Sequence, residues 1–179
     1  MRYNPFEGKL VRLRAREPEE EALIYQWFND AEVTEHLSMR YPLSHAQERE
    51  FLERVGFPSY NHVNFAVETF DGKLIGAAGL EQTSPENRSA TLGIAIGDKS
   101  YWDGGYGTDT MRVVCRFGFD MMNLHRIHLE VFAENERAQH VYQSIGFQVE
   151  GRLRDAFFKY GAYQDVVVMA LLEGELQSG

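Results

Sequence analysis

The stretch YWDGGYGTDTMRVVCRFGFDMMNLHRIHLEVFAENERAQHVYQSIGF, residues 101–147, decides the fold of this chain. Three glycines, Gly104, Gly105 and Gly107, stand directly before apolar residues that recur with the 3.6-residue spacing of a helix. Glycine lacks a Cβ atom, so backbone amides can approach a bulky anion, and free amides at the start of a helix bind phosphate. The stretch therefore predicts a phosphate-binding turn that opens a helix over residues 108–122.

The turn does not match the better-known nucleotide motifs. A P-loop needs a Lys followed by Ser or Thr after its last glycine, whereas Gly107 is followed by Thr108 and Asp109. The G-x-G-x-x-G spacing of a dinucleotide site is also absent. A tight connection without a ligand is one interpretation of the turn, and a site for a less charged diphosphate is the other.

A strand and a second helix follow. Residues 126–131 alternate apolar and polar side chains, which indicates a strand with one buried face. Asn135 is a natural N-cap for a helix over residues 136–145, and Tyr142 lies about two turns further along it. A plain helix cap and a plain core aromatic are the simpler interpretations of these two residues. A phenol in this position could also protonate a departing thiolate, whose free pKa is about 8.5.

The stretch resembles the GCN5-related N-acetyltransferases, most closely the branch of the ribosomal-protein N-terminal and spermidine acetyltransferases. The family signature Asn-x-x-Ala-x-x-x-Tyr-x-x-x-Gly-Phe matches, without gaps, Asn135, Ala138, Tyr142, Gly146 and Phe147. The resemblance runs from about residue 9 to about residue 172 and is weakest between residues 17 and 60.

The family's turn, Q/R-x-x-G-x-G/A, corresponds to residues 102–107. Trp102 stands where the family has Gln or Arg, as it often does in this branch. The branch often continues with Gly-Lys-Gly-Tyr, so Asp103 and Gly104 remove a basic residue that could help to bind phosphate.

The resemblance implies an α+β fold with a central mixed, mostly antiparallel sheet that is splayed between two strands and has helices on both faces. It implies acetyl-CoA as cosubstrate, no metal, and direct attack by a neutral amine without an acyl-enzyme intermediate. Tyr142 would be the general acid. The implied cofactor contacts are backbone groups of Ile94 and Ile96 for the pantetheine, the turn residues Trp102, Gly104, Gly105, Gly107 and Thr108 for the pyrophosphate, and Asn135 and Ala138 beside the thioester.

The base that accepts the proton of the amine is harder to assign. Related enzymes often carry a Glu early in the strand before the turn, but the matching position here is Thr91. Glu81, just past the preceding strand, is the predicted substitute, and a solvated loop charge is the alternative interpretation. A base that acts through water also stays open.

The acceptor is predicted to be a cation. The net charge of −9 favours cationic amines and disfavours nucleic acid. Asp30, Glu32 and Glu35 fall where family members place acceptor contacts, although a solubilising helix face would also explain them. A polyamine, an amino sugar, an amino acid and a protein N-terminus all remain possible acceptors. The aromatic residues of 157–163 would line the acceptor pocket or form a dimer surface, and the resemblance implies a homodimer.

Two other functions would also use parts of this pattern. A non-catalytic acyl-CoA sensor would keep the glycine turn but lose the acid, and an acyltransferase with another acyl donor or a hydroxyl acceptor would need a wider channel. Cys115, the only cysteine, falls among apolar helix positions and is predicted to be a buried structural thiol rather than a nucleophile.

The whole chain, residues 1–179, is predicted to form a single domain, with acceptor-side helices over about 17–60 and an acetyl-CoA-binding core over about 89–147. No uncharged run approaches the roughly twenty residues of a transmembrane helix, and no signal peptide is evident, so a cytoplasmic protein is expected. Further strands are predicted at 9–14, 63–69, 74–80, 90–96, 147–157 and 163–172, and further helices at 18–29 and 44–55.

Overall fold

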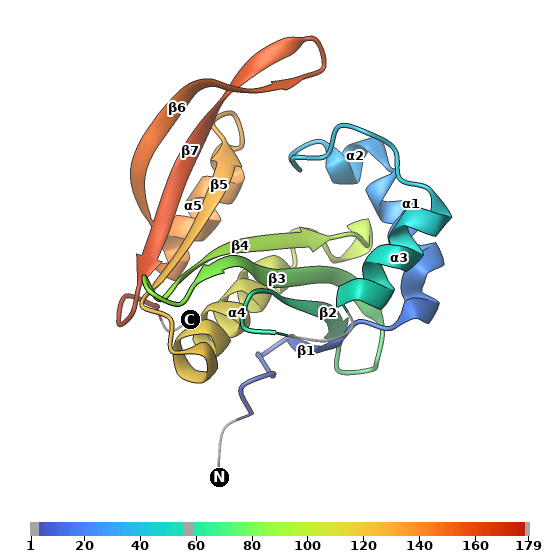
Figure 1. The fold of residues 1–179 in the computed structure, drawn as a ribbon, viewed down its shortest axis with the longest axis horizontal. Helices are drawn as coiled ribbons and strands as arrows, with labels where there is room; N and C mark the ends of the chain where they lie inside the picture. The colour runs from blue at the N-terminus through green and yellow to red at the C-terminus, as the bar shows by residue number, and fades with distance from the viewer. Residues whose placement is uncertain (1–3, 56–58, 178–179) are drawn as a thin grey trace.

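The computed structural model describes residues 4–55 and 59–177, so the part of the predicted acceptor-side region at 56–58 lies outside the described residues. One sheet of seven strands runs in the order β1-β2-β3-β4-β5-β7-β6 (Figure 1). Its strands are β1 (Val11–Ala15), β2 (Val63–Thr69), β3 (Leu74–Ser84), β4 (Ser89–Ile96), β5 (Arg126–Phe132), β6 (Gln148–Lys159) and β7 (Ala162–Leu172).

The helices are α1 (Glu21–Phe28), α2 (Ala31–Thr34), α3 (His45–Val55), α4 (Tyr106–Met122) and α5 (Glu136–Ile145), with short 3₁₀ turns at Pro18–Glu20 and Lys99–Tyr101. The sequence did not predict α2, which is a single short turn capped by Asp30. The other predicted helices and strands are present, with ends that differ by a few residues. No helix within the described ranges is long and apolar enough to cross a membrane.

The β4–β5 pair is the parallel one in this otherwise antiparallel sheet. Its register runs from Ser89 opposite Arg126 to Thr91 opposite His128 and ends there. Beyond that point β4 stays paired with β3, and β5 stays paired with β7. Figure 1 shows the two strands diverging. The predicted splayed, mostly antiparallel sheet is confirmed.

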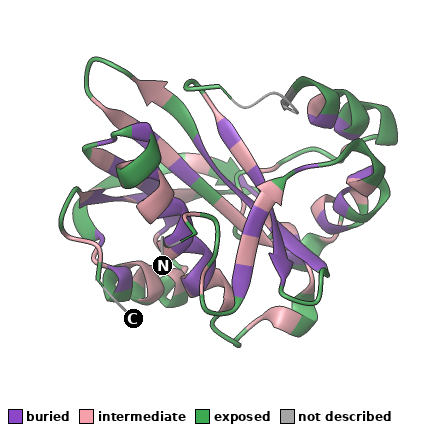
Figure 2. Ribbon diagram, turned by 90° about the horizontal axis from the view of Figure 1, so that it is seen from below, coloured by how far each residue is buried: buried purple, intermediate pink, exposed green. Residues whose placement is uncertain are grey.

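Two apolar clusters hold the layers together. The larger one joins α4 and α5 to one face of the sheet through side chains such as Met111, Val114, Ile127, Leu129 and Ile145. The smaller one joins α1, α2 and α3 to the opposite face, where Ile24, Trp27, Val33 and Leu52 meet Ala66 and Leu74. Figure 2 shows that buried positions alternate with exposed ones along the strands and helices. Helices therefore cover both faces of the sheet, as predicted.

Local sequence signals explain where these helices begin and end. Ser44 and Gln47 exchange backbone-to-side-chain hydrogen bonds of 2.9 and 3.2 Å, which is the predicted capping box. Gly105 caps α4 with a left-handed backbone, φ +82°, so α4 begins at Tyr106, two residues before the predicted start at 108. Gly146 ends α5 with φ +118°.

Candidate active site

A cleft of about 770 Å³ lies between the end of β4, the glycine turn and α5. It is lined by eleven of the predicted site residues: Glu32, Glu35, Ile94, Ile96, Trp102, Gly105, Gly107, Thr108, Asn135, Ala138 and Tyr142. Three predicted residues, Asp30, Gly104 and Glu81, are not among its lining residues. Segments that are far apart in the sequence thus meet around one cavity large enough for a small ligand.

The glycine turn lies across the end of β4. A Cβ added to Gly107 would be 3.8 Å from the Ile96 side chain, which is an ordinary van der Waals distance. A Cβ on Gly104 would lie 3.0 Å from the Tyr106 ring, so Gly104 makes room for that ring. Gly105, Gly107 and Thr108 line the cleft, so an anion bound there would meet the first turn of α4 and the positive end of its dipole.

Trp102 fixes the turn to the strand. Its indole Nε1 donates a hydrogen bond of 2.8 Å to the Ile96 carbonyl, and its ring packs against the smaller apolar cluster. Ile96 is predicted to bind the pantetheine through its backbone, but its carbonyl already accepts this hydrogen bond from Trp102.

Asn135 and Tyr142 occupy the α5 side of the cleft. Asn135 Oδ1 accepts a hydrogen bond of 3.0 Å from the Ala138 amide, so the predicted N-cap is confirmed. Among residues 4–55 and 59–177 its side-chain NH₂ group has no acceptor, so a ligand could use its two donors. The Tyr142 ring is half-buried against the larger cluster, 6.2 Å from the Phe147 ring, and burial raises the pKa of its phenol. At neutral pH Tyr142 therefore carries a proton that it can donate.

Two of the three predicted acceptor acids are already paired. Lys99 Nζ lies 2.7 Å from Asp30 Oδ2 and 2.6 Å from Glu32 Oε2. The hydrogen bond from Lys99 holds the pKa of Asp30 below its usual value. Glu35 is exposed and lines the cleft. The carboxylates of Asp30 and Glu32 are thus partly neutralised by Lys99.

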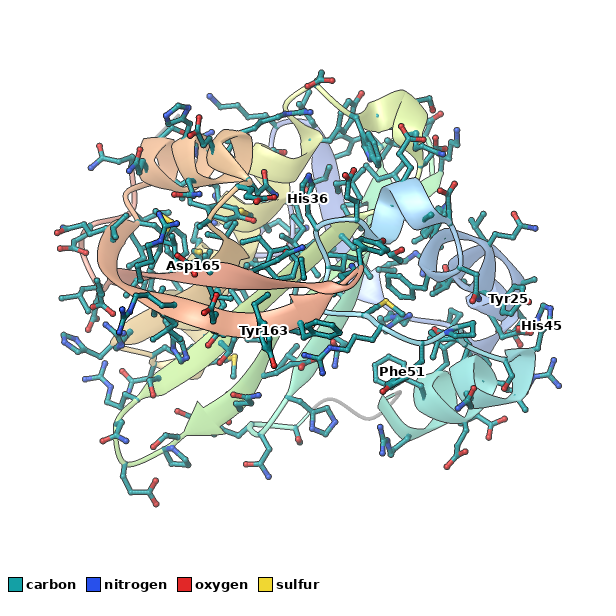
Figure 3. The ribbon with its side chains drawn as sticks, turned by 90° about the horizontal axis from the view of Figure 1, so that it is seen from above. Tyr25, His36, His45, Phe51, Tyr163 and Asp165 are labelled. Carbon is teal, nitrogen blue, oxygen red and sulfur yellow. The ribbon has the colours of Figure 1, made fainter. Side chains whose placement is uncertain are left out.

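Lys159 lies outside the cleft but anchors the loop that carries Glu35, and the sequence did not predict this contact. Its ammonium group donates to the carbonyls of Thr34, Glu35 and Leu37, at 2.6, 3.1 and 2.8 Å, and the side chain is only 6% exposed. Burial lowers its pKa. These bonds tie the β6–β7 hairpin to the loop after α2; in Figure 3, Tyr163 marks the hairpin and His36 marks the loop. More than a hundred residues separate the partners, so no local pattern could reveal the contact.

A basic residue also reaches the turn from α5. Arg137 forms an ion pair with Asp103, and both residues line the cleft. The turn that lacks a lysine in the sequence thus has an arginine beside it in the fold. Asp109 is turned the other way: its carboxylate accepts hydrogen bonds from the amides of Lys9, Leu10 and Val11 at the start of β1.

The remaining reactive groups do not reach the cleft. Glu81 is exposed on β3, opposite Thr91, so its assignment as base stays a prediction. Cys115 is fully buried in the core, and burial raises the pKa of its thiol, so it is not poised to act as a nucleophile. Within residues 4–55 and 59–177, no three His, Cys, Asp or Glu side chains are grouped so that they could hold a metal ion.

Comparisons with known proteins identify the family of this chain. The family model of the acetyltransferase (GNAT) domain matches residues 11–148. The chain is 31% identical over 167 residues to the spermidine N(1)-acetyltransferase of Escherichia coli K12, covering 91% of this chain and 86% of that protein. It is 29% identical over 169 residues to the uncharacterized N-acetyltransferase p20 of Bacillus licheniformis, covering 92% and 94%.

Solved structures give the same result. The structure of spermidine N-acetyltransferase from Vibrio cholerae in complex with CoA and spermine superposes with a TM-score of 0.86. That match has 28% sequence identity and covers 92% of this chain and 96% of the other. With its splayed sheet, its glycine turn and a family match over most of its length, the chain belongs to the GNAT family and is an N-acetyltransferase that uses acetyl-CoA.

Proposed function

We propose that this enzyme transfers the acetyl group of acetyl-CoA to a primary amine of a polyamine, by direct attack of the neutral amine while both substrates are bound. The observation that carries the proposal is the cleft itself. The glycine turn lines one end of the cleft. Tyr142 on α5 lines it as well, together with the stretch of β4 beyond Thr91 that is not paired with β5.

The residues present fit the cosubstrate. The amides around Gly105, Gly107 and Thr108 would hold the pyrophosphate, and Arg137 would add a positive charge there. Backbone groups of β4 around Ile94 would pair with the pantetheine, because the β4–β5 register ends at Thr91.

The chemistry needs an acid near the sulfur atom. Bound acetyl-CoA supplies an activated acetyl group and a thiolate that leaves. Tyr142 would donate its proton to that sulfur, and its raised pKa keeps the proton on the phenol until the thiolate departs. The Asn135 side-chain NH₂ would hydrogen-bond the cosubstrate beside the reacting group.

A polyamine is the acceptor that the charges and the relatives favour. The E. coli and V. cholerae relatives carry the name spermidine N-acetyltransferase. Among the described residues, the cleft is lined by four glutamates and one arginine: Glu32, Glu35, Glu134, Glu136 and Arg137. A flexible polycation can meet several exposed carboxylates at once, whereas an amino acid would bring a carboxylate that they repel. The predicted homodimer and cytoplasmic location stay predictions.

The test is turnover of acetyl-CoA, measured as free thiol release, with spermidine, spermine, an aminoglycoside, free amino acids and short peptides as acceptors. We expect the two polyamines to give the highest kcat/KM. Preference for a peptide N-terminus or for an amino acid would overturn the polyamine assignment but keep the enzyme. Tight acetyl-CoA binding without turnover on any acceptor would favour the non-catalytic sensor.

A further inference from the structure

An ion pair joins the glycine turn to α5 at the cleft. The Arg137 guanidinium, in the first turn of α5, is paired with the carboxylate of Asp103, which directly precedes the glycines of the turn. Both residues line the cleft, together with Gly105, Gly107 and Thr108. The pair therefore lies at the end of the cleft where the proposed function places the diphosphate of acetyl-CoA.

The pair is open to solvent. The side chains of Arg137 and Asp103 are 66% and 74% exposed, so water and salt screen their attraction. Neither side chain has a second polar partner in the described parts of the chain. Either side chain can therefore exchange its partner for a ligand at small cost.

The backbone beside the pair can bind an anion. The amides of Gly107 and Thr108, in the first turn of α4, donate to no acceptor within residues 4–55 and 59–177. Arg137 adds a positive charge to this end of the cleft, and the carboxylate of Asp103 cancels it. One of the two side chains thus attracts a bound phosphate, and the other repels it.

The local fold does not require an aspartate at this position. Asp103 has a left-handed backbone, φ +62°, which glycine and asparagine also adopt. Its side chain is not the cap of α4, because Gly105 is the N-cap residue. The carboxylate is therefore explained by its contact with Arg137, and an asparagine would fit the same backbone.

We propose that Asp103 competes with acetyl-CoA for Arg137, and that this competition sets how tightly the enzyme holds the cosubstrate and the product CoA. In the free enzyme Asp103 occupies the guanidinium. When the cosubstrate binds, its diphosphate takes the guanidinium, because phosphate groups carry more charge than one carboxylate and match the arginine fork. The pair forms again when CoA leaves. This role rests on the proposed function, which places the diphosphate at the glycine turn.

Two effects of Asp103 weaken binding. The ligand has to break the pair, and the released carboxylate then lies near the phosphates and repels them. Holding Arg137 in place would have the opposite effect, but a pair this exposed restrains the side chain only weakly. Acetyl-CoA and CoA carry the same phosphates, so Asp103 weakens the binding of both and favours release of the product.

The direct test measures the Kd of CoA by titration calorimetry at low salt, for the parent enzyme and three variants. Asp103→Asn removes the charge but suits the left-handed backbone, and CoA should bind about fivefold more tightly. Arg137→Gln should weaken binding about tenfold. In the double variant there is no guanidinium to compete for, so Asp103→Asn should tighten binding by about twofold or less.

Asp71→Asn is the matched control, because it removes the same charge from an exposed hairpin turn outside the cleft. It should leave the Kd of CoA near the parent value, since salt screens a distant charge. Unchanged or weaker CoA binding by Asp103→Asn would overturn the proposal. Equal tightening with and without Arg137 would also overturn it, because Asp103 would then act by repulsion alone.

Two further measurements test the site and the release step. 3′-Dephospho-CoA keeps the diphosphate, so Asp103→Asn should tighten its binding by the same factor as that of CoA. Loss of this effect would place the pair at the 3′-phosphate and reject competition at the turn. The dissociation rate of CoA, followed by stopped flow, should fall in Asp103→Asn, and an unchanged rate would reject the role in product release.

These measurements use no acceptor, so they decide the role of Asp103 even if no polyamine is acetylated. If Arg137→Gln bound CoA as the parent does, Arg137 would not contact the phosphates. Both the competition and that part of the proposed function would then be wrong. If Arg137→Gln bound weakly while Asp103→Asn bound as the parent does, only the competition would be wrong.

Discussion

The two walls of the cleft are built in different ways. The cofactor wall, made of the end of β4, the glycine turn and α5, comes from nearly consecutive segments whose positions follow from helix caps and strand register. The acceptor wall, made of α2 and the loop that follows it, is held to the end of β6 by side chains such as Lys159 and Arg40, across more than a hundred residues. Local sequence therefore specifies the first wall, and tertiary contacts specify the second.

The cofactor wall should show the largest effect, in Tyr142→Phe. This variant keeps the packed ring but removes the proton, so kcat should fall about 10²- to 10⁴-fold while the Kd of acetyl-CoA changes little. Because burial raises the Tyr142 pKa, loss of the acid form in the parent enzyme should appear only above the ordinary tyrosine value of about 10. Single-turnover thiol release over this pH range measures both quantities.

A matched control is Tyr60→Phe, since Tyr60 is exposed and is not among the residues lining the cleft. If Tyr142→Phe kept the parent kcat while chemistry limited the rate, another group would have to protonate the sulfur, and the cofactor wall would serve binding alone.

The same contrast explains what the sequence could predict. The turn, Asn135 and Tyr142 were found because glycine conformation, helix capping and 3.6-residue spacing are local properties, and the family signature follows them. Short α2 was missed because a single capped turn has too few residues for a periodic pattern. Lys159 was missed because its significance comes from partners on a distant loop. The acids Asp30 and Glu32 were predicted without their partner, Lys99, which lies in a later loop.

Breaking the acceptor wall should have an intermediate effect. Lys159→Met fills similar space but leaves three carbonyls without their buried donor, so we expect unfolding to become easier by about 2 kcal/mol. The KM for spermidine should rise about tenfold, because the loop carrying Glu35 loses its anchor, while the KM for acetyl-CoA stays near the parent value. Denaturant unfolding and steady-state kinetics measure these quantities.

Lys73→Met is the control for this variant, because Lys73 pairs with Asp98 at the surface and should contribute less than about 1 kcal/mol. If Lys159→Met raised the KM for spermidine and the KM for acetyl-CoA equally, the acceptor wall and the cofactor wall would not be independent of each other.

The smallest effects should distinguish the acids within the acceptor wall. Asp30 is held by Lys99 and is not among the lining residues of the cleft, whereas Glu35 is exposed and lines it. Asp30→Asn should therefore change the KM for spermidine less than twofold, and Glu35→Gln should raise it about fivefold, as expected for one ion pair in a solvated site. Added salt should reduce the Glu35 effect, since solvent ions screen such a pair. If Asp30→Asn had the larger effect, Lys99 would have to release this carboxylate when the amine binds, and the acceptor wall would be rearranged by its substrate.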